Sequence, residues 1–309
     1  MREDPVNFYS QGSRLSGLIR RPDGEGPWPA VAQGPGWLGL KDAKLYEPYH
    51  RALTAAGFAV LIFDYRGFGD SEPAPGGLSL HHQIDDWVNA VAYLESRDDV
   101  FADRIGLFGS GGTGGGNAIL AAARLTQIRS TVIQVPVSDG EDWLRRMRRG
   151  YEWQEFLARL AADRTKRVTT DAGEWVNPRE EILVPTPERR KTAIKSDVDG
   201  RVPDSVPLAL AEEIIAYKPI DVVAQVGHLL VIAVEDDAVT PTDHAVALYR
   251  AASTPKRMIL QRQTSHYAAY EQYGDIVIPE IVAWFAAHLT GRAVEAETPD
   301  GTESLREVP

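Results

Sequence analysis

The sequence of 309 residues contains no cysteine, which excludes disulfides, cysteine-based metal sites and a thiol nucleophile. Apolar runs of the length that a membrane helix needs, roughly eighteen residues, are also absent. The first ten residues, MREDPVNFYS, lack the apolar segment of a secretory signal. We therefore expect a cytoplasmic protein with no membrane partner.

The chain has fewer basic residues than acidic residues. The chain carries 33 Lys and Arg against 44 Asp and Glu, which gives a formal net charge of -11. A negative field of this size disfavours nucleic acid as a partner and favours solubility. The expected partner is a small-molecule substrate, and a homodimer is left open as an alternative to a monomer.

Short apolar runs alternate with segments of helical spacing. The runs that predict buried strands are Phe58–Tyr65, Ile105–Phe108, Ser130–Val137 and His228–Val234. The segments that predict helices are Lys44–Ala56, His82–Leu94, Thr242–Ala252 and Ile276–Leu289. Strands alternating with helices predict an α/β protein with a mainly parallel, doubly wound sheet.

One long segment departs from this alternation. Residues 138–225 are rich in Arg, Glu and Trp and contain helical stretches. We predict a helical cap insertion there, over the sheet edge where ligands of such folds bind. The core is then 1–137 and 226–290, and the polar residues 291–309 are predicted to form a disordered tail.

A dense glycine cluster follows one of the predicted strands. The stretch Arg104–Asn117 reads RIGLFGSGGTGGGN, which indicates a strand, a very tight turn and a helix. This context resembles the nucleophile elbow of α/β-hydrolases, where G-x-S-x-G holds a serine on strained backbone. In the frame Gly109-Ser110-Gly111-Gly112-Thr113 the nucleophile position falls on Gly111, which has no side chain.

Three further segments extend the resemblance over roughly residues 6 to 290. They are Asp64–Ser71 (DYRGFGDS), Asp236, which we match to the acid position of the family's D-x-x-V-P pattern, and His266 after the last predicted strand. Elbow, acid and histidine follow in the order of the α/β-hydrolase superfamily. The chain is most similar to capped bacterial hydrolases of the esterase, dienelactone hydrolase and C–C hydrolase kind. The resemblance implies a hydrolase.

The acid and the histidine would form a proton-handling pair. A carboxylate at Asp236 would fix the tautomer of His266, whose pKa range suits a general base. In a continuing strand Glu235 and Asp237 would face the opposite side, so we expect both to be solvated. Asp139 is the second choice for the acid.

In such a site, negative charge develops on the substrate carbonyl oxygen during the reaction, and backbone N–H groups stabilise it. The resemblance points to the loop Gln33-Gly34-Pro35-Gly36-Trp37, but proline has no N–H to offer. We predict Gly112, Gly36 and Trp37 as oxyanion donors. Trp143 and Tyr267 are candidate substrate-binding residues.

Gly111 admits several interpretations. We favour an enzyme that acts on a small organic carbonyl compound, by hydrolysis or C–C cleavage, with a His-Asp dyad and no serine nucleophile. One alternative is a conventional serine esterase or amidase present as a Ser-to-Gly inactive variant. Another is a non-catalytic ligand-binding protein on the same fold. Thr113, in the shifted frame Gly111-x-Thr113-x-Gly115, is an alternative nucleophile. We expect no metal and no cofactor.

Overall fold

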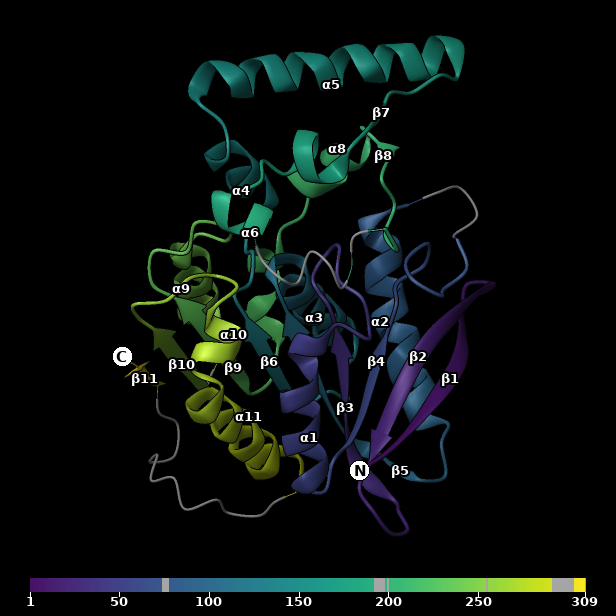
Figure 1. Ribbon diagram of the computed structural model, residues 1–309, viewed down its shortest axis with the longest axis vertical. Helices are drawn as coiled ribbons and strands as arrows, with labels where there is room; N and C mark the ends of the chain where they lie inside the picture. Colours follow the sequence, from purple (N-terminus) through teal and green to yellow (C-terminus); the bar gives the residue numbers. More distant parts are fainter. Residues whose placement is uncertain (74–77, 192–197, 199, 254, 291–302, 309) are drawn as a thin grey trace.

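The computed structural model describes residues 1–73, 78–191, 198, 200–253, 255–290 and 303–308. A nine-stranded twisted sheet forms the centre of the molecule, and helices cover both of its faces (Figure 1). The strand order is β1-β2-β4-β3-β5-β6-β9-β10-β11. The predicted α/β class with a mainly parallel sheet is confirmed. No helix in the described part of the chain is long and apolar enough to cross a membrane.

The sheet begins with an antiparallel hairpin and continues in parallel. The hairpin strands are β1 (Arg2–Ser10) and β2 (Ser13–Arg21), and β2 also runs antiparallel to β4. The remaining neighbours pair in parallel. These strands are β3 (Trp28–Gly34), β4 (Ala59–Phe63), β5 (Val100–Ser110), β6 (Ser130–Gln134), β9 (Leu229–Val234), β10 (Lys256–Gln261) and β11 (Glu303–Val308).

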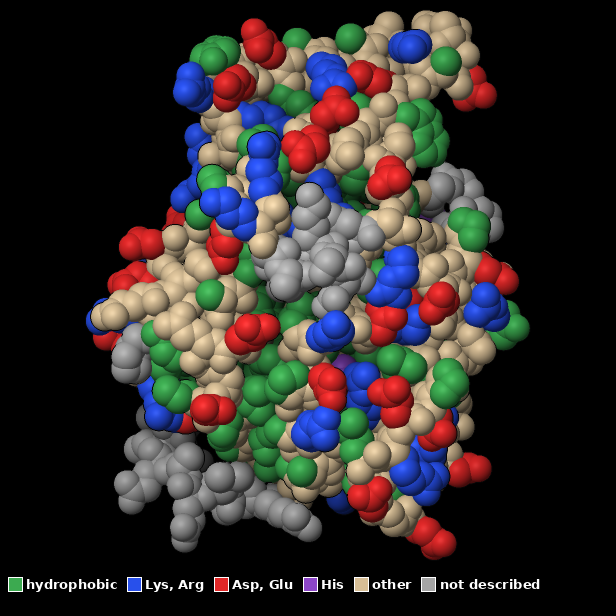
Figure 2. Space-filling model, viewed as in Figure 1, with side chains coloured by type: hydrophobic (Ala, Val, Ile, Leu, Met, Phe, Trp, Pro, Cys, Tyr) green, Lys and Arg blue, Asp and Glu red, His purple; other side chains and the backbone are tan. Residues whose placement is uncertain are grey.

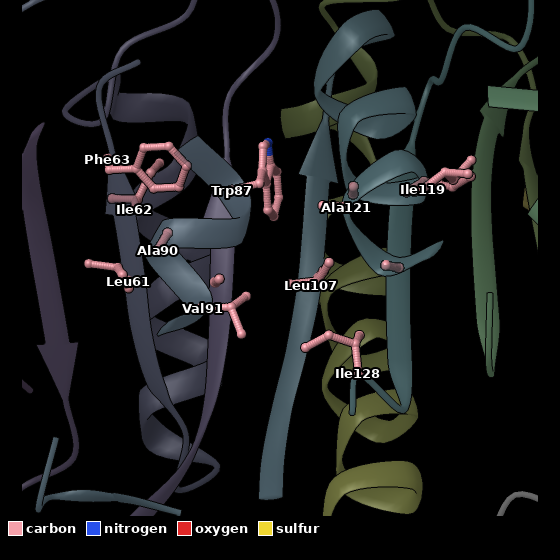
Figure 3. Close-up of a cluster of buried hydrophobic side chains, with 14 of the residues drawn as sticks. Leu61, Ile62, Phe63, Trp87, Ala90, Val91, Leu107, Ile119, Ala121 and Ile128 are labelled. Carbon is pink, nitrogen blue, oxygen red and sulfur yellow. The ribbon is translucent and has the colours of Figure 1, made fainter. Parts of the chain in front are cut away.

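Apolar side chains of the central strands fill a core on each face of the sheet. On β5 the neighbours Leu107 and Phe108 point to opposite faces and join different clusters. The cluster around Leu107 packs against α2 (Leu80–Glu95), α3 (Gly112–Arg124) and α9 (Thr242–Ala251), as Figure 3 illustrates for Trp87 and Ile119. The cluster around Phe108 packs against α1 (Glu47–Ala55) and α11 (Gly274–Leu289).

The direction of the chain reverses at the centre of the sheet. From β3 the chain moves outward to β4, whereas β5 lies on the other side of β3, with Gly34 in register with Gly109. In open α/β sheets the crevice at such a reversal is where ligands bind, at the carboxyl ends of the strands. The loops that follow β3 and β5 are therefore placed side by side at this position.

The segment between β6 and β9 lies above the carboxyl ends of the strands (Figure 1). Its helices are α4 (Gly140–Arg146), α5 (Gly150–Thr170), the π-helical turn η2 (Pro178–Ile182), α6 (Pro187–Lys191) and α8 (Leu210–Ile215). Two short strands, β7 (Trp175–Val176) and β8 (Val206–Pro207), pair with each other. Most of its buried apolar side chains share one cluster with Trp37 and Leu80 of the core, and a few, such as Val202 and Val223, join the cluster around Leu107. The segment is therefore packed onto the core.

The chain end differs from the prediction of a disordered tail over 291–309. Glu303–Val308 forms β11, which pairs in parallel with β10 from Lys256↔Glu303 to Gln261↔Val308. Val308 is buried against the α11 side of the sheet. The backbone of these residues is ordered by hydrogen bonds to the open edge of β10, and their polar composition does not indicate this pairing. The other residues of the predicted tail, 291–302 and 309, lie outside the described residues.

Candidate active site

The tight turn between β5 and α3 is located at Gly111. This residue has φ +80° and ψ 168°, and α3 starts directly after it. Side chains are strained in this left-handed region, and glycine adopts it without that cost. A Cβ atom on Gly111 would lie 3.1 Å from the Cα of Gly36, so the side-chain position faces the loop after β3. Gly111 thus occupies the elbow of the fold.

Thr113 is in the first turn of α3, two residues beyond the elbow. The alternative motif frame, with Thr113 as the nucleophile at the elbow, is therefore wrong. It required β5 to extend to Gly112, but the strand ends at Ser110. The Thr113 side chain is only 1% exposed, and within the described residues its Oγ1 has no hydrogen-bond partner. Thr113 lines the cavity beside Gly111 and Gly112, but its hydroxyl oxygen is itself buried.

His266 is paired with Asp237. Nδ1 of the histidine lies 2.8 Å from Oδ2 of the aspartate, and both side chains are buried. Asp237 also accepts hydrogen bonds from the backbone N–H groups of Val239 at 2.7 Å and Thr240 at 2.9 Å, and from the Thr240 hydroxyl at 3.0 Å. Burial works against its charge, but His266 and these N–H groups hold the pKa of Asp237 below its ordinary value.

The prediction of Asp236 as the acid is wrong by one residue. Strand β9 ends at Val234, and Asp236 adopts a left-handed φ of +55° in the turn that follows. The alternation of a strand therefore no longer applies, and the turn exposes Asp236 while it buries Asp237. Pro241 was the available signal, because it stands four residues after Asp237 and completes a D-x-x-x-P pattern. The second choice, Asp139, caps α4 and is paired with Lys218 at 2.5 Å.

The predicted oxyanion donors lie in the cavity wall. Gly112 is the first residue of α3, so its N–H has no acceptor within the helix. The backbone of Gly36, however, is hydrogen-bonded to the Tyr46 hydroxyl, which also contacts the side chain of Ser110. Gly112 and Trp37 are therefore the better placed donors of the three.

A group of buried hydroxyls lies behind the elbow and was not predicted. Burial raises the pKa of Tyr46 to about 12, so this phenol stays protonated at neutral pH. Ser110 Oγ donates to the hydroxyl of Tyr270 at 3.1 Å, which directs it into this group. Tyr46 and Tyr270 are separated by more than two hundred residues, and no sequence spacing links them to the elbow.

A cavity of about 170 Å³ lies between the elbow, His266 and the segment between β6 and β9. Trp143 and Tyr267, the predicted substrate-binding residues, both lie in its wall. The Trp143 indole donates to the carbonyl of Val239 at 2.7 Å. The Tyr267 ring packs edge-on against the His266 ring, with centroids 4.8 Å apart. The cavity thus joins the histidine, the turn at Gly111 and both aromatic residues.

Two arginines in the cavity wall were not predicted. Arg179 belongs to η2 and Arg189 to α6. The sequence showed them only as members of a mixed charge run, which is usually a solvated face. Elsewhere among the described residues, His, Asp and Glu side chains form no group of three that could hold a metal ion.

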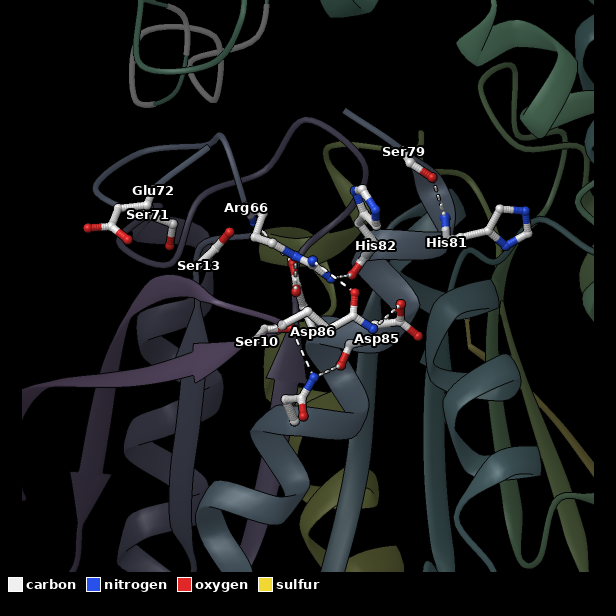
Figure 4. Close-up of polar contacts among 12 residues, drawn as sticks. Ser10, Ser13, Arg66, Ser71, Glu72, Ser79, His81, His82, Asp85 and Asp86 are labelled. Carbon is white, nitrogen blue, oxygen red and sulfur yellow. Dashed lines mark hydrogen bonds and ion pairs between the residues drawn. The ribbon is translucent and has the colours of Figure 1, made fainter. Parts of the chain in front are cut away.

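The loop after β4 contains the motif Asp64–Ser71, from which the sequence predicted it. Two buried acids fix this loop. Asp64 accepts from the backbone N–H of Lys41 at 2.8 Å and from its Nζ at 2.7 Å, which ties this loop to the one after β3. Asp86 of α2 accepts from the N–H of Arg66 at 3.0 Å and from its Nε at 2.6 Å (Figure 4). The motif therefore braces the loop that carries Gly36 and Trp37.

One sequence relative matches nearly the whole chain, and another matches less than half of it. An uncharacterized 31.7 kDa protein from the traX-finO intergenic region of Escherichia coli is 28% identical over 286 residues, which is 91% of this chain and 97% of that protein. The quorum-quenching protein AidA of Acinetobacter baumannii (strain MDR-ZJ06) is 33% identical over 136 residues, 44% of each chain.

Solved structures and a family comparison agree with the fold. The α/β-hydrolase GrgF from Penicillium sp. sh18 superposes with a TM-score of 0.78 at 18% identity, over 94% of this chain and all of that one. At this identity the likeness supports the fold alone. The family described as X-Pro dipeptidyl-peptidase (S15 family) matches residues 11–268, which is most of the chain. The chain is therefore a hydrolase of the α/β-hydrolase fold and belongs to the S15 family.

Proposed function

We propose that this protein hydrolyses a small carboxylic ester or thioester with an activated water molecule and forms no acyl-enzyme. The observation that carries the proposal is the Asp237–His266 pair, which borders a cavity whose wall at position 111 has no side chain. Histidine suits the abstraction of a proton from water near neutral pH, a contribution of about 10²- to 10⁴-fold.

The reaction would proceed in two proton transfers. His266 takes a proton from water at Nε2 while the water oxygen attacks the carbonyl carbon, and the imidazolium is stabilised through Nδ1 by Asp237. The tetrahedral intermediate then expels the alcohol or thiol, which receives that proton from His266. The products are the acid and the free alcohol or thiol, and the histidine is regenerated.

The wall around Gly111 supports a bound water and an oxyanion. Gly112 and His266 both line the cavity beside position 111, and a buried water needs two to four polar partners of this kind. A carbonyl oxygen that accepts from Gly112 and Trp37 would have its negative charge stabilised in the transition state. Removing one such donor typically costs about 10²- to 10³-fold in rate.

An ester or thioester fits the cavity better than the dipeptide that the family name suggests. An exopeptidase of that kind must bind a protonated amino terminus, whereas no aspartate or glutamate is found in the wall that the described residues form. Most of the wall is apolar, as an acyl chain requires. The quorum-quenching relative is compatible with small-molecule hydrolysis but covers less than half of the chain.

The test compares two neighbouring acids. D237N and H266A should each lower kcat/KM on a p-nitrophenyl ester by roughly 10³-fold or more, whereas D236N, one residue away on exposed backbone, should stay within about twofold. Intact-protein mass spectrometry during turnover should detect no acyl adduct. Equal losses in D236N and D237N, or a mass increase equal to the acyl group, would contradict the proposal.

A conventional serine esterase present as a Ser-to-Gly variant is the second candidate. The left-handed φ of Gly111 favours it, since that turn is built to project a nucleophile. A non-catalytic binding protein would bind ligands and give no turnover in any form. The response of the chain to a restored serine separates these candidates and is treated in the Discussion.

A further inference from the structure

We propose that the cavity selects acyl substrates that carry a second, anionic group, and that Arg179, Arg189 and the Tyr267 hydroxyl bind this group as a carboxylate. This inference rests on the proposed function and names its substrate class. The substrate is a half-ester of an aliphatic dicarboxylic acid: the ester carbonyl lies at Gly111, and the free carboxylate lies at the arginines.

Arg179 is held at the cavity by its own side chain, and Arg189 by the helix that carries it. Arg179 donates through Nη2 to the carbonyl of Leu38 at 3.1 Å, which fixes its guanidinium against the loop after β3. Arg189 is carried by α6, and the preceding residue, Glu188, anchors that helix to the loop of His266. The Glu188 carboxylate accepts from the N–H of Tyr267 at 3.2 Å and from the Ser265 hydroxyl.

The Tyr267 hydroxyl interacts electrostatically with both Arg179 and Arg189. Burial raises the pKa of this hydroxyl to about 12, so it donates a hydrogen bond at neutral pH. The charges of Glu188 and Asp237 add to this rise in pKa, whereas those of Arg189 and Arg179 oppose it. Tyr267, Arg179 and Arg189 line the same cavity. Tyr267 packs against His266, so this group of three donors lies next to the reacting centre. Charge-assisted hydrogen bonds of this kind are about twice as strong as neutral ones.

The remaining wall defines the rest of the substrate. The wall that holds the elbow and the arginines is otherwise lined largely by apolar side chains, which include Leu38, Leu45, Met147, Leu183 and Val184. A hydrocarbon linker would bury its apolar surface against them. A linker of a few methylene groups joins the two polar ends.

The arginines also face the outside. They line a second, outer depression of about 180 Å³, which they share with Arg190. Lys and Arg side chains gather over α4 and α6 in the space-filling view (Figure 2), and exposed members are Arg145, Arg146 and Arg190. These three arginines are paired with Asp142, Asp243 and Glu180, and Glu180 and Asp204 also line the outer depression, so this surface carries charges of both signs. The selection of an anion therefore depends on Arg179 and Arg189 in the cavity wall.

The experiment compares mono-p-nitrophenyl adipate, an anion, with its neutral methyl ester. We expect wild type to prefer the anion by about tenfold or more in kcat/KM, because two charge-assisted contacts are at stake. R189Q and R179Q should each bring the ratio of the two kcat/KM values close to one through a raised KM for the anion. The readout is this ratio and not the rate on either ester alone, because Arg179 also donates to the carbonyl of Leu38, next to Trp37. R190Q, on the same helix but exposed and paired with Glu180, is the matched control and should retain the preference.

Binding without turnover separates this inference from the proposed function. Calorimetry on H266A should give tighter binding of monomethyl adipate than of dimethyl adipate, and H266A/R189Q should abolish the difference. If no ester is turned over but this contrast remains, the proposed function fails and the anion site stands. Equal binding of the two adipates overturns the site. Butyl phosphate binding more than about tenfold tighter than monomethyl adipate overturns the carboxylate assignment in favour of a phosphoryl group.

Discussion

Thr240 places its hydroxyl 3.0 Å from Oδ2 of Asp237, the same oxygen that faces Nδ1 of His266 at 2.8 Å. Thr240 also lines the cavity beside Gly112, but its hydroxyl is directed at the carboxylate. It is a positioning residue, because it holds the carboxylate in the orientation that the histidine requires.

We predict that T240V lowers kcat about 10- to 100-fold, since loss of a group that orients such a partner has effects of this size. KM should change little, because the hydroxyl is turned to Asp237 and valine keeps a methyl group in the cavity wall. T240S keeps the hydroxyl and should restore most of the activity. The pH profile of kcat/KM should shift in T240V and return to that of wild type in T240S. An unchanged profile with a lower thermal stability would mean that Thr240 only packs.

Restoring a side chain at the elbow distinguishes the candidate functions. In the proposed mechanism G111S should give no gain in steady-state turnover of aryl esters, because the hydroxyl occupies the position of the attacking water. The added Cβ meets Gly36 Cα at 3.1 Å, which small backbone shifts can relieve. A gain of 100-fold or more, with a burst of p-nitrophenol, would identify the chain as an inactive variant of a serine hydrolase. Turnover by neither form, with ligand binding intact, would identify a binding protein.

The Asp237–His266 pair should also affect stability as a function of pH. The pKa of Asp237 is lowered in the folded protein. Its contribution is therefore present above the ordinary pKa of an aspartate, near 4, and is lost as the pH falls through the lowered value. At pH 7 we expect D237N to lower the free energy of unfolding by about 1.5–3 kcal/mol. Urea titrations at pH 7 and pH 3 should show the difference between wild type and D237N shrinking in acid. A difference that grows in acid would contradict the assignment.

Strand β11 makes a prediction about the chain end. Ending the chain after residue 302 removes the ladder with β10 and exposes the surface that Val308 covers. Loss of one buried valine alone costs about 1.5–3 kcal/mol, so the melting temperature should fall by several degrees. L305A is the control on the same strand, because Leu305 is largely exposed, and it should melt close to wild type. A truncated chain as stable as wild type would mean that β11 contributes nothing to the fold.

The fold could be predicted from the sequence because its signals are local and repeated. Apolar runs such as Phe58–Tyr65 and Ile105–Phe108 have the length and composition of strands buried on both faces, and helical spacing separates them. β11 could not be predicted from its own residues. Its order depends on an open edge at β10, which lies more than forty positions earlier in the chain.

The site was predictable only where a motif fixes the backbone. The glycine cluster located the turn at Gly111, and the position of His266 follows from the last strands. The acid was missed by one residue because the left-handed turn at Asp236 reverses which neighbour is buried. The arginines at 179 and 189 were missed because their approach to Tyr267 depends on how η2 and α6 pack, which no local pattern encodes.

The bare elbow at Gly111 has a practical consequence for surveys of hydrolases. Fluorophosphonate and sulfonyl fluoride reagents report an enzyme by bonding covalently to the activated hydroxyl at this turn. Here the turn offers only hydrogen, and the adjacent Ser110 hydroxyl is directed into the tyrosines behind it. Profiling by such labels would leave this protein undetected however fast it turns over, and only assays of product release would register it.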